Sequence, residues 1–526
     1  MKSFSLQFRH VVMLSFVVTL SATSFVRAEV TTESPTSLVR TEESPIQDTK
    51  VFESLIQGWN ALEKTISEAS NSLVELFEDI FHIQHHDRPK FNYDVTLVGF
   101  VNFADGIGRH PILFKECLEG RAKMNFVSTR NIPADIEDAQ LGLPRLDPAN
   151  KQDIGAVSIL TDILADRALN LYTKVPSSLI KIAYTMFEST EIPYCWAKIL
   201  NEKFDMAVVP DPFLINVYRN CGVKIPMFVL PLPLILHDFL KIKQRPVPHK
   251  PFVFGVTGGF WKRKNHMKVL EAFAAEFGNR SDVTLKLHGR FGEKHIIQEL
   301  VNKIRAYGLT NVELIVGPYN WDEYLEFFKS LDCYVFLSMG EGFSITPREA
   351  LACGKPCILT SNTAQISICN SGAVRVVPSR ILVPAFYDSH YYNYHYPNSC
   401  DLKLTRNFCE ADNLDLLNSL TDTDDEINLA LKSVSIGYQF DCTVEDAREA
   451  MRDVYEHYNL YLHKAKQGRE WVQAYLHKNL CKKYVSMVKP KTVILGTENI
   501  IGDEFLMTNS KELYEKYRYI LGNTGK

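Results

Sequence analysis

Two glutamates, Glu341 and Glu349, lie in a stretch of small and apolar residues with seven residues between them. A carboxylate accepts two hydrogen bonds at once, so Glu349 can bind a diol such as that of ribose. Gly340 and Gly342 flank Glu341, and we expect them to leave room for a sugar ring against the backbone. Pro347 favours the first turn of a helix, where free N–H groups bind anions or hydroxyls. The alternative is a helix cap and a surface glutamate.

A basic motif, Lys262 to Lys264, follows the two glycines Gly258 and Gly259. Lysine and arginine side chains neutralise a diphosphate through charge-assisted hydrogen bonds. The motif therefore indicates a turn that binds phosphate groups, and the alternative is a basic helix start on the surface.

These motifs fall among short apolar runs that alternate with helical stretches from Asp94 onward. This alternation predicts an α/β protein of two Rossmann-like, doubly wound domains. In the first domain, residues 93–240, we expect strands at Val95 to Val101, Met124 to Val127, Ala156 to Leu160, Ile182 to Met186, Met206 to Val209 and Met227 to Leu230. In the second domain, residues 241–425, we expect strands at Phe252 to Val256, Val283 to Leu287, Val312 to Val316, Cys333 to Leu337 and Pro356 to Leu359. Ligands bind at the carboxyl ends of such strands, which is where the motifs lie.

The frame around the two glutamates, with Gly-Phe after Glu341 and Ala-Leu-Ala-x-Gly-x-Pro after Glu349, resembles the signature of a known family. It is similar to that of retaining family-4 glycosyltransferases of the GT-B fold, the glycosyl transferases group 1 type. The resemblance covers about residues 94 to 370 and implies that the two domains face each other across a cleft. It implies that Glu341 lies by the donor sugar and Glu349 at the ribose, with Gly342 and Phe343 in the donor site.

The resemblance extends to the basic motif. It implies that Arg263 and Lys264 bind the donor diphosphate, although Gly259 stands where the family usually has an arginine. In such a retaining transfer the cations stabilise the departing diphosphate, and the acceptor hydroxyl passes its proton to a phosphate oxygen. The catalytic residues implied are Glu341, Glu188 and Lys264.

Two loops of the first domain also match the family's pattern. Gly106, Gly108 and Arg109 belong to a glycine loop that, by resemblance, closes over the donor phosphates or the acceptor. Glu188 follows a predicted strand at a place where the family often has histidine. Glu188 either faces the donor sugar or bonds to nearby backbone.

The composition limits the partners. Of the 526 residues, 58 are basic and 62 acidic, and a net charge of -4 gives no reason to expect nucleic acid. No acidic cluster has metal-ligand spacing and no C-x-x-C pair is present, so we expect no metal and no cofactor besides the donor. The expected partners are a nucleotide sugar and a carbohydrate, lipid-linked or protein acceptor.

The N-terminal residues differ in composition from the rest of the chain. Lys2 and Arg9 precede an apolar run up to Val26, and small residues allow cleavage after Ala28. Residues 1–28 are therefore predicted to be a signal peptide or a retained membrane anchor, which places the chain on the secretory route, secreted or membrane-anchored. Residues 29–92 contain a linker and an amphipathic helix that can self-associate, associate with a membrane or pack on the same protein.

Two later segments also lie outside the resemblance or match it loosely. Residues 383–412 look like an inserted loop, and residues 426–526 predict C-terminal helices with an irregular tail from about 488. Cys400, Cys409 and Cys442 either form one disulfide or remain three free thiols.

Together these features predict a metal-independent glycosyltransferase of hexosyltransferase type. It would move a sugar from a nucleotide-diphosphate sugar to an acceptor hydroxyl with retention of configuration. The alternative is a catalytically inactive, secreted sugar- or nucleotide-binding protein of the same fold.

Overall fold

The computed structural model describes residues 91–103, 106–130, 141–146, 153–164, 178–388, 433–496, 501 and 505–521. The chain divides into units of residues 1–89 and 90–526, and every described residue belongs to the second. The predicted signal peptide and the helix expected within residues 29–92 lie outside the described residues. Among the described residues, no helix has the length and apolar character needed to cross a membrane.

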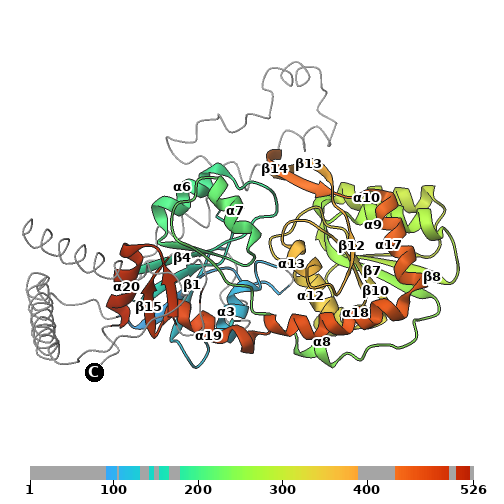
Figure 1. Ribbon diagram of the computed structural model, residues 1–526. Helices are drawn as coiled ribbons and strands as arrows, with labels where there is room; N and C mark the ends of the chain where they lie inside the picture. Colours follow the sequence, from blue (N-terminus) through green and yellow to red (C-terminus); the bar gives the residue numbers. More distant parts are fainter. Residues whose placement is uncertain are drawn as a thin grey trace, which may run out of the picture. The chain divides into compact units, whose positions relative to one another are not determined.

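The first domain is built on a sheet of six parallel strands in the order β2-β1-β3-β4-β5-β6. Figure 1 labels β1 and β4 of this sheet. Its helices are α3 (His110–Leu118), α6 (Tyr194–Lys203), α7 (Phe213–Asn220) and, after the last strand, α8 (His237–Lys241). The strands are β1 (Tyr93–Gly99), β2 (Met124–Ser128), β3 (Gly155–Leu160), β4 (Ile180–Tyr184), β5 (Met206–Val209) and β6 (Met227–Val229).

Successive side chains of these strands enter two different cores, because a strand directs its side chains alternately to the two faces of a sheet. Leu97 and Ile159 belong to a core that also contains residues of α3, whereas Val98 and Leu160 belong to a core with residues of α6 and α7. The sheet is therefore covered on both faces, as the continuous apolar runs predict.

The second domain repeats this plan with parallel strands in the order β12-β11-β10-β7-β8-β9. The strand β10, which precedes Glu341, lies in the middle of this sheet. The strands are β7 (Phe252–Phe260), β8 (Val283–Gly292), β9 (Val312–Val316), β10 (Cys333–Phe336), β11 (Cys357–Thr360) and β12 (Arg375–Val377). The helices are α9 (His266–Phe277), α10 (Lys294–Ala306), α11 (Trp321–Ser330), α12 (Ile345–Ala352) and α13 (Gln365–Cys369), with the short 3-10 turn η1 (Lys262–Lys264).

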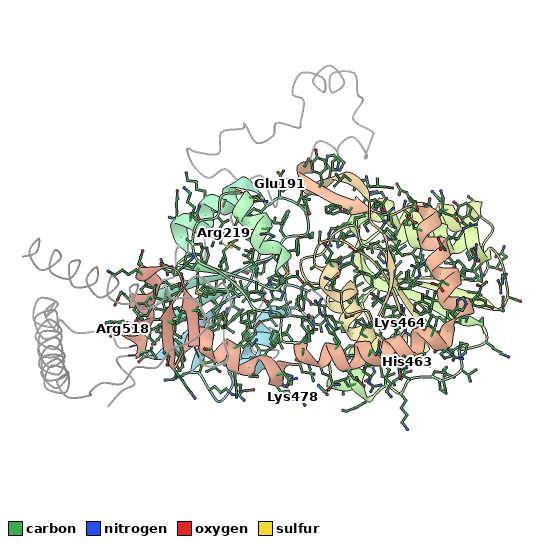
Figure 2. The ribbon with its side chains drawn as sticks, viewed as in Figure 1. Glu191, Arg219, His463, Lys464, Lys478 and Arg518 are labelled. Atoms are coloured by element: carbon green, nitrogen blue, oxygen red, sulfur yellow. The ribbon has the colours of Figure 1, made fainter. Side chains whose placement is uncertain are left out.

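The C-terminal helices run from the second domain to the first. In the second domain, α17 (Val444–Glu456) packs on α9 and α18 (Tyr458–Trp471) packs on α12, whereas α19 (His477–Val488) packs on α3 of the first domain. Lys464 on α18 and Lys478 on α19 mark the two halves of this crossing in Figure 2.

Two parts of the chain differ from the sequence-based expectation. The predicted irregular tail contains β15 (Thr492–Leu495), β16 (Phe505–Thr508) and α20 (Lys511–Leu521), and Tyr517 of α20 is fully buried. The predicted loop of residues 383–412 begins inside β13 (Ile381–Asp388), which pairs antiparallel with β14 (Ser433–Asp441). These strands are short or far apart in sequence, so local periodicity does not reveal them. Residues 389–432 lie outside the described residues.

Candidate functional site

The predicted site residues lie at the carboxyl ends of strands from both sheets. Glu341 follows β10, the basic turn η1 follows β7, and Glu188 follows β4. The amide of Met339 donates to the carbonyl of Arg263 at 2.9 Å, which fixes the basic turn against the loop that carries Glu341. The parallel strands of each sheet thus bring together residues that are far apart in the sequence.

The carboxylate of Glu341 is buried and receives three hydrogen bonds on one oxygen. Lys264 Nζ lies 2.6 Å from Oε1, Arg263 Nη1 at 2.8 Å, and Ser338 Oγ at 2.6 Å. Burial alone would raise the pKa of Glu341, but Lys264 and Arg263 outweigh it and lower this pKa. Burial lowers the pKa of Lys264, and Glu341 opposes that shift. The described residues make all their hydrogen bonds to this carboxylate through Oε1, so Oε2 remains an acceptor for another donor.

Arg263 connects the two domains. Its Nη2 lies 2.9 Å from Oε1 of Glu188 in the first domain, while its Nη1 binds Glu341 and donates to the carbonyl of Gly340 at 2.5 Å. Two predicted catalytic carboxylates therefore share one guanidinium. The sequence left open whether Glu188 bonds only to nearby backbone, and here its carboxylate faces the second domain.

Glu349 makes a second link between the domains. Arg109 Nη2 donates to its Oε1 at 3.0 Å, and the Tyr324 hydroxyl of α11 donates to its Oε2 at 2.7 Å. Burial alone would lower the pKa of Arg109, but Glu349 and Tyr324 together outweigh it and raise that pKa. Burial raises the pKa of Tyr324 well above its ordinary value, and the neighbouring carboxylate adds to this effect. Both oxygens that we expect to bind a ribose therefore have protein partners in this structure.

The glycines beside Glu341 have a different role from the one predicted. A Cβ added at Gly340 would lie 2.1 Å from the carbonyl oxygen of Glu188, and one at Gly342 would lie 2.9 Å from Cγ of Met186. The space beside both glycines is occupied by the loop after β4, so it is not open to a sugar ring. The glycines instead allow the two domains to approach each other here.

The two glycines of the first-domain loop also differ from each other. A Cβ at Gly108 would lie 2.7 Å from Cβ of Asn102, so the fold of the loop itself requires glycine there. A Cβ at Gly106 would meet no described atom within 4 Å. Gly106 therefore lies in open space, as a loop that approaches a ligand would require.

Phe343 and Arg348, between the two glutamates, are both buried. The Arg348 guanidinium lies 3.9 Å from the Phe343 ring centroid and 4.5 Å from that of Tyr475, and it donates to the carbonyls of Phe343 and Ser344. Ser344 has a φ of 64°, a strained value for a residue with a side chain. Arg348 thus holds the turn that joins Glu341 to Glu349. The sequence motifs did not indicate this role of Arg348.

The strand β14 completes the surroundings of the site. The amide of Phe440 donates to the carbonyl of Met339 at 2.8 Å, and Tyr438 forms two hydrogen bonds with Thr190 in the loop after β4. Glu191 of that loop lies near this strand in Figure 2. The sequence did not indicate this strand as part of the site. Among the residues that the structure describes, no group of His, Cys, Asp and Glu is arranged to hold a metal ion.

Comparisons with known proteins show the architecture and a family resemblance of the second domain. HepE from Anabaena, in complex with UDP and glucose, matches with a TM-score of 0.52 and 10% identity over 75% of this chain and 99% of HepE. The same protein in complex with UDP-glucose gives a TM-score of 0.50, with 10% identity over 75% of this chain and 99% of its own. The two facing α/β domains are therefore of the GT-B type.

Residues 238–382, which include most of the second domain, match the model of the family Glycosyl transferases group 1. No curated protein matches the chain by sequence. The GT-B fold and the match of residues 238–382 both support a glycosyltransferase, the class that the motifs around Glu341 and Glu349 predicted.

Proposed function

We propose that this protein transfers a sugar from a nucleoside diphosphate sugar to an acceptor hydroxyl with retention of configuration. The observation that carries the proposal is the cluster of Arg263, Lys264 and Glu341 at the carboxyl edge of the second sheet, within a glycosyl transferases group 1 domain. Two cations beside one buried carboxylate can bind a diphosphate and remain close to the sugar that it carries.

The diphosphate would replace a carboxylate as partner of the cations. Arg263 and Lys264 are now neutralised by Glu341 and, for Arg263, also by Glu188. A diphosphate brings more negative charge than one carboxylate, so it can draw both cations toward its oxygens. The same contacts strengthen as the bond to the sugar breaks and charge grows on the leaving group, which accelerates the reaction.

The carboxylates have separate roles in this proposal. Glu341 Oε2, which receives no hydrogen bond from the described residues, accepts one from a hydroxyl of the donor sugar. Glu349 exchanges the hydrogen bond of Arg109 or Tyr324 for those of the ribose hydroxyls. The acceptor hydroxyl loses its proton to a phosphate oxygen of the leaving group. The chain's own residues therefore supply charge stabilisation and orientation.

The first experiment is a panel of nucleoside diphosphates tested for thermal stabilisation of the full chain, beginning with UDP. A ligand at a concentration of 100 times its dissociation constant raises the free energy of unfolding by about 2.7 kcal/mol. The second experiment incubates the chain with the matching nucleotide sugar and measures release of free nucleotide with and without candidate acceptors. Release supports the transferase. Binding without release, across carbohydrate, lipid-linked and protein acceptors, supports the inactive binding protein instead.

A further inference from the structure

Two cysteines that are far apart in the sequence lie in contact inside the first domain. Cys117 is on α3 and Cys481 is on α19, and their sulfur atoms are 3.4 Å apart. Both are buried, with exposed fractions of 0% and 4%. The C-terminal helix that crosses from the second domain is thus joined to the first domain at a pair of thiols.

The surrounding contacts fix these helices in register at this point. The Cys481 thiol lies 2.9 Å from the carbonyl oxygen of His477, and the Cys117 thiol lies 3.5 Å from the same oxygen. One turn away from each cysteine, the rings of Phe114 and Tyr484 meet edge to face with centroids 4.9 Å apart. The two sulfurs are therefore held together by the packing of the helices and do not meet by chance rotation of exposed side chains.

A disulfide requires the sulfurs to approach to about 2.05 Å, which is about 1.4 Å closer than here. Rotation about the Cα–Cβ bonds with a small shift of one helix covers that distance. The bond would close a loop between positions that are 364 apart in sequence, and loops of this length gain most in the chain-entropy description of disulfides.

We propose that Cys117 and Cys481 form an intramolecular disulfide that fastens α19 to α3 when the chain folds in the presence of a disulfide oxidant such as glutathione disulfide. One thiolate attacks the oxidant, forming a mixed disulfide and releasing one glutathione thiol. The second thiol attacks the mixed disulfide and releases the second glutathione thiol. The two cysteine protons end on the two released thiols, so two cysteines are oxidised and one glutathione disulfide is reduced.

Because the two cysteines are buried in the folded protein, the oxidation must take place during folding. Burial raises the pKa of the Cys117 thiol, so in the finished fold it stays protonated and reacts slowly. Exchange is fast only before α19 has docked fully on α3. Once formed, the disulfide is shielded from reductants by the same packing. The proposal does not depend on the proposed transferase activity.

The test compares full-length chain folded in an oxidising compartment with chain folded in a reducing one. Each preparation is shown to unfold cooperatively, its free thiols are blocked with N-ethylmaleimide under denaturing conditions, and unreduced digests are analysed by mass spectrometry. We expect a peptide linked through Cys117 and Cys481 in the first preparation, absent in the second. The linked form should also have the higher urea midpoint, and dithiothreitol under denaturing conditions should abolish the difference.

Variants separate the bond from other effects of oxidation. Cys117→Ala and Cys481→Ala should each remove both the linked peptide and the rise in midpoint. Cys369→Ala, at a buried thiol near the carbonyl of Thr360, should keep both. Recovery of Cys117 and Cys481 as blocked free thiols in folded chain from the oxidising compartment overturns the proposal, as does a link from either one to another cysteine. If the alanine variants fail to fold, the peptide analysis of the unaltered chain still decides.

Discussion

Arg109 of the first domain donates a hydrogen bond of 3.0 Å to Glu349 of the second, and both side chains are almost fully removed from solvent. This pair joins the glycine loop to the helix that starts beside Glu341. A ligand that takes the hydrogen bonds of Glu349 must therefore loosen one of the contacts that hold the domains together. If Glu349 binds the ribose as proposed, binding of nucleotide and relative movement of the domains are coupled at this carboxylate.

Glu349→Gln should weaken binding of a nucleoside diphosphate, because an amide retains one oxygen acceptor but loses the charge. Hydrogen bonds to a charged group contribute about 1.5–3 kcal/mol. Calorimetry with the diphosphate found in the panel measures the loss. The matched control is Glu326→Gln, at an exposed position of α11. Equal affinities of Glu349→Gln and the unaltered chain would exclude the ribose role.

Lys264→Ala should reduce turnover far more than it reduces stability, because the ammonium group lies at the edge of the sheet beside Glu341. Lys262 belongs to the same 3-10 turn and is exposed, so Lys262→Ala is the control for loss of one basic side chain. Turnover is measured as nucleotide release, and stability as the urea midpoint. A Lys264→Ala chain that unfolds early while its folded fraction keeps full activity would show a structural role.

Glu341→Gln should lower kcat with only a modest change in nucleotide affinity. In the proposed reaction the carboxylate lies near the positive charge that develops on the sugar, and this interaction is stronger in the transition state than in the ground state. Steady-state kinetics and calorimetry on the same preparation separate the two effects. A normal kcat in this variant would contradict the assignment.

Acid should destabilise the protein partly through His110. Burial lowers the pKa of His110 to about 4, and the nearby Arg109 adds to this shift. The unfolded chain binds the proton near pH 6.5, so stability falls as the pH drops below 6.5 and levels off below about 4. Between these two pH values the free energy of unfolding changes by about 1.4 kcal/mol per pH unit for one such group. Urea midpoints measured from pH 7 to 5 should fall less steeply in His110→Gln, and exposed His463→Gln should match the unaltered chain.

The N-terminus gives a prediction that does not depend on the site. We expect chain produced in its native host to have lost residues up to Ala28, or to remain membrane-attached through the apolar run that ends at Val26. Mass spectrometry of the purified chain measures the first residue, and fractionation measures the attachment. A soluble chain with an intact N-terminus would contradict both forms of the prediction.

Local patterns in the sequence predicted most strands of both sheets. The strand at Met206–Val209 lies where its apolar run placed it, because buried strands of parallel sheets are continuous apolar runs. β4 begins two residues earlier than expected, since Lys181 interrupts the apolar run at its start. β7 extends to Phe260, because the glycines at its end continue to pair with β8.

The site was predicted less completely than the fold. The strand-end motifs correctly indicated that Glu341, Arg263 and Lys264 lie together, since parallel strands end at one edge of a sheet. They did not indicate Tyr324 or Arg348, whose roles depend on packing between helices. They also did not indicate that Gly340 would contact the other domain, because a sequence does not show which backbone approaches a glycine.

The crossing of α18 and α19 has a consequence for the synthesis of the chain. One face of the first sheet is closed by residues from the far end of the sequence, among them Tyr484 and Tyr517, and Tyr517 donates to the carbonyl of Met487 at 2.6 Å. At ~5–20 residues per second, the ribosome needs tens of seconds to proceed from the end of β6 to α20. The first domain to emerge is therefore the last to be completed, and one of its apolar faces stays uncovered until translation ends.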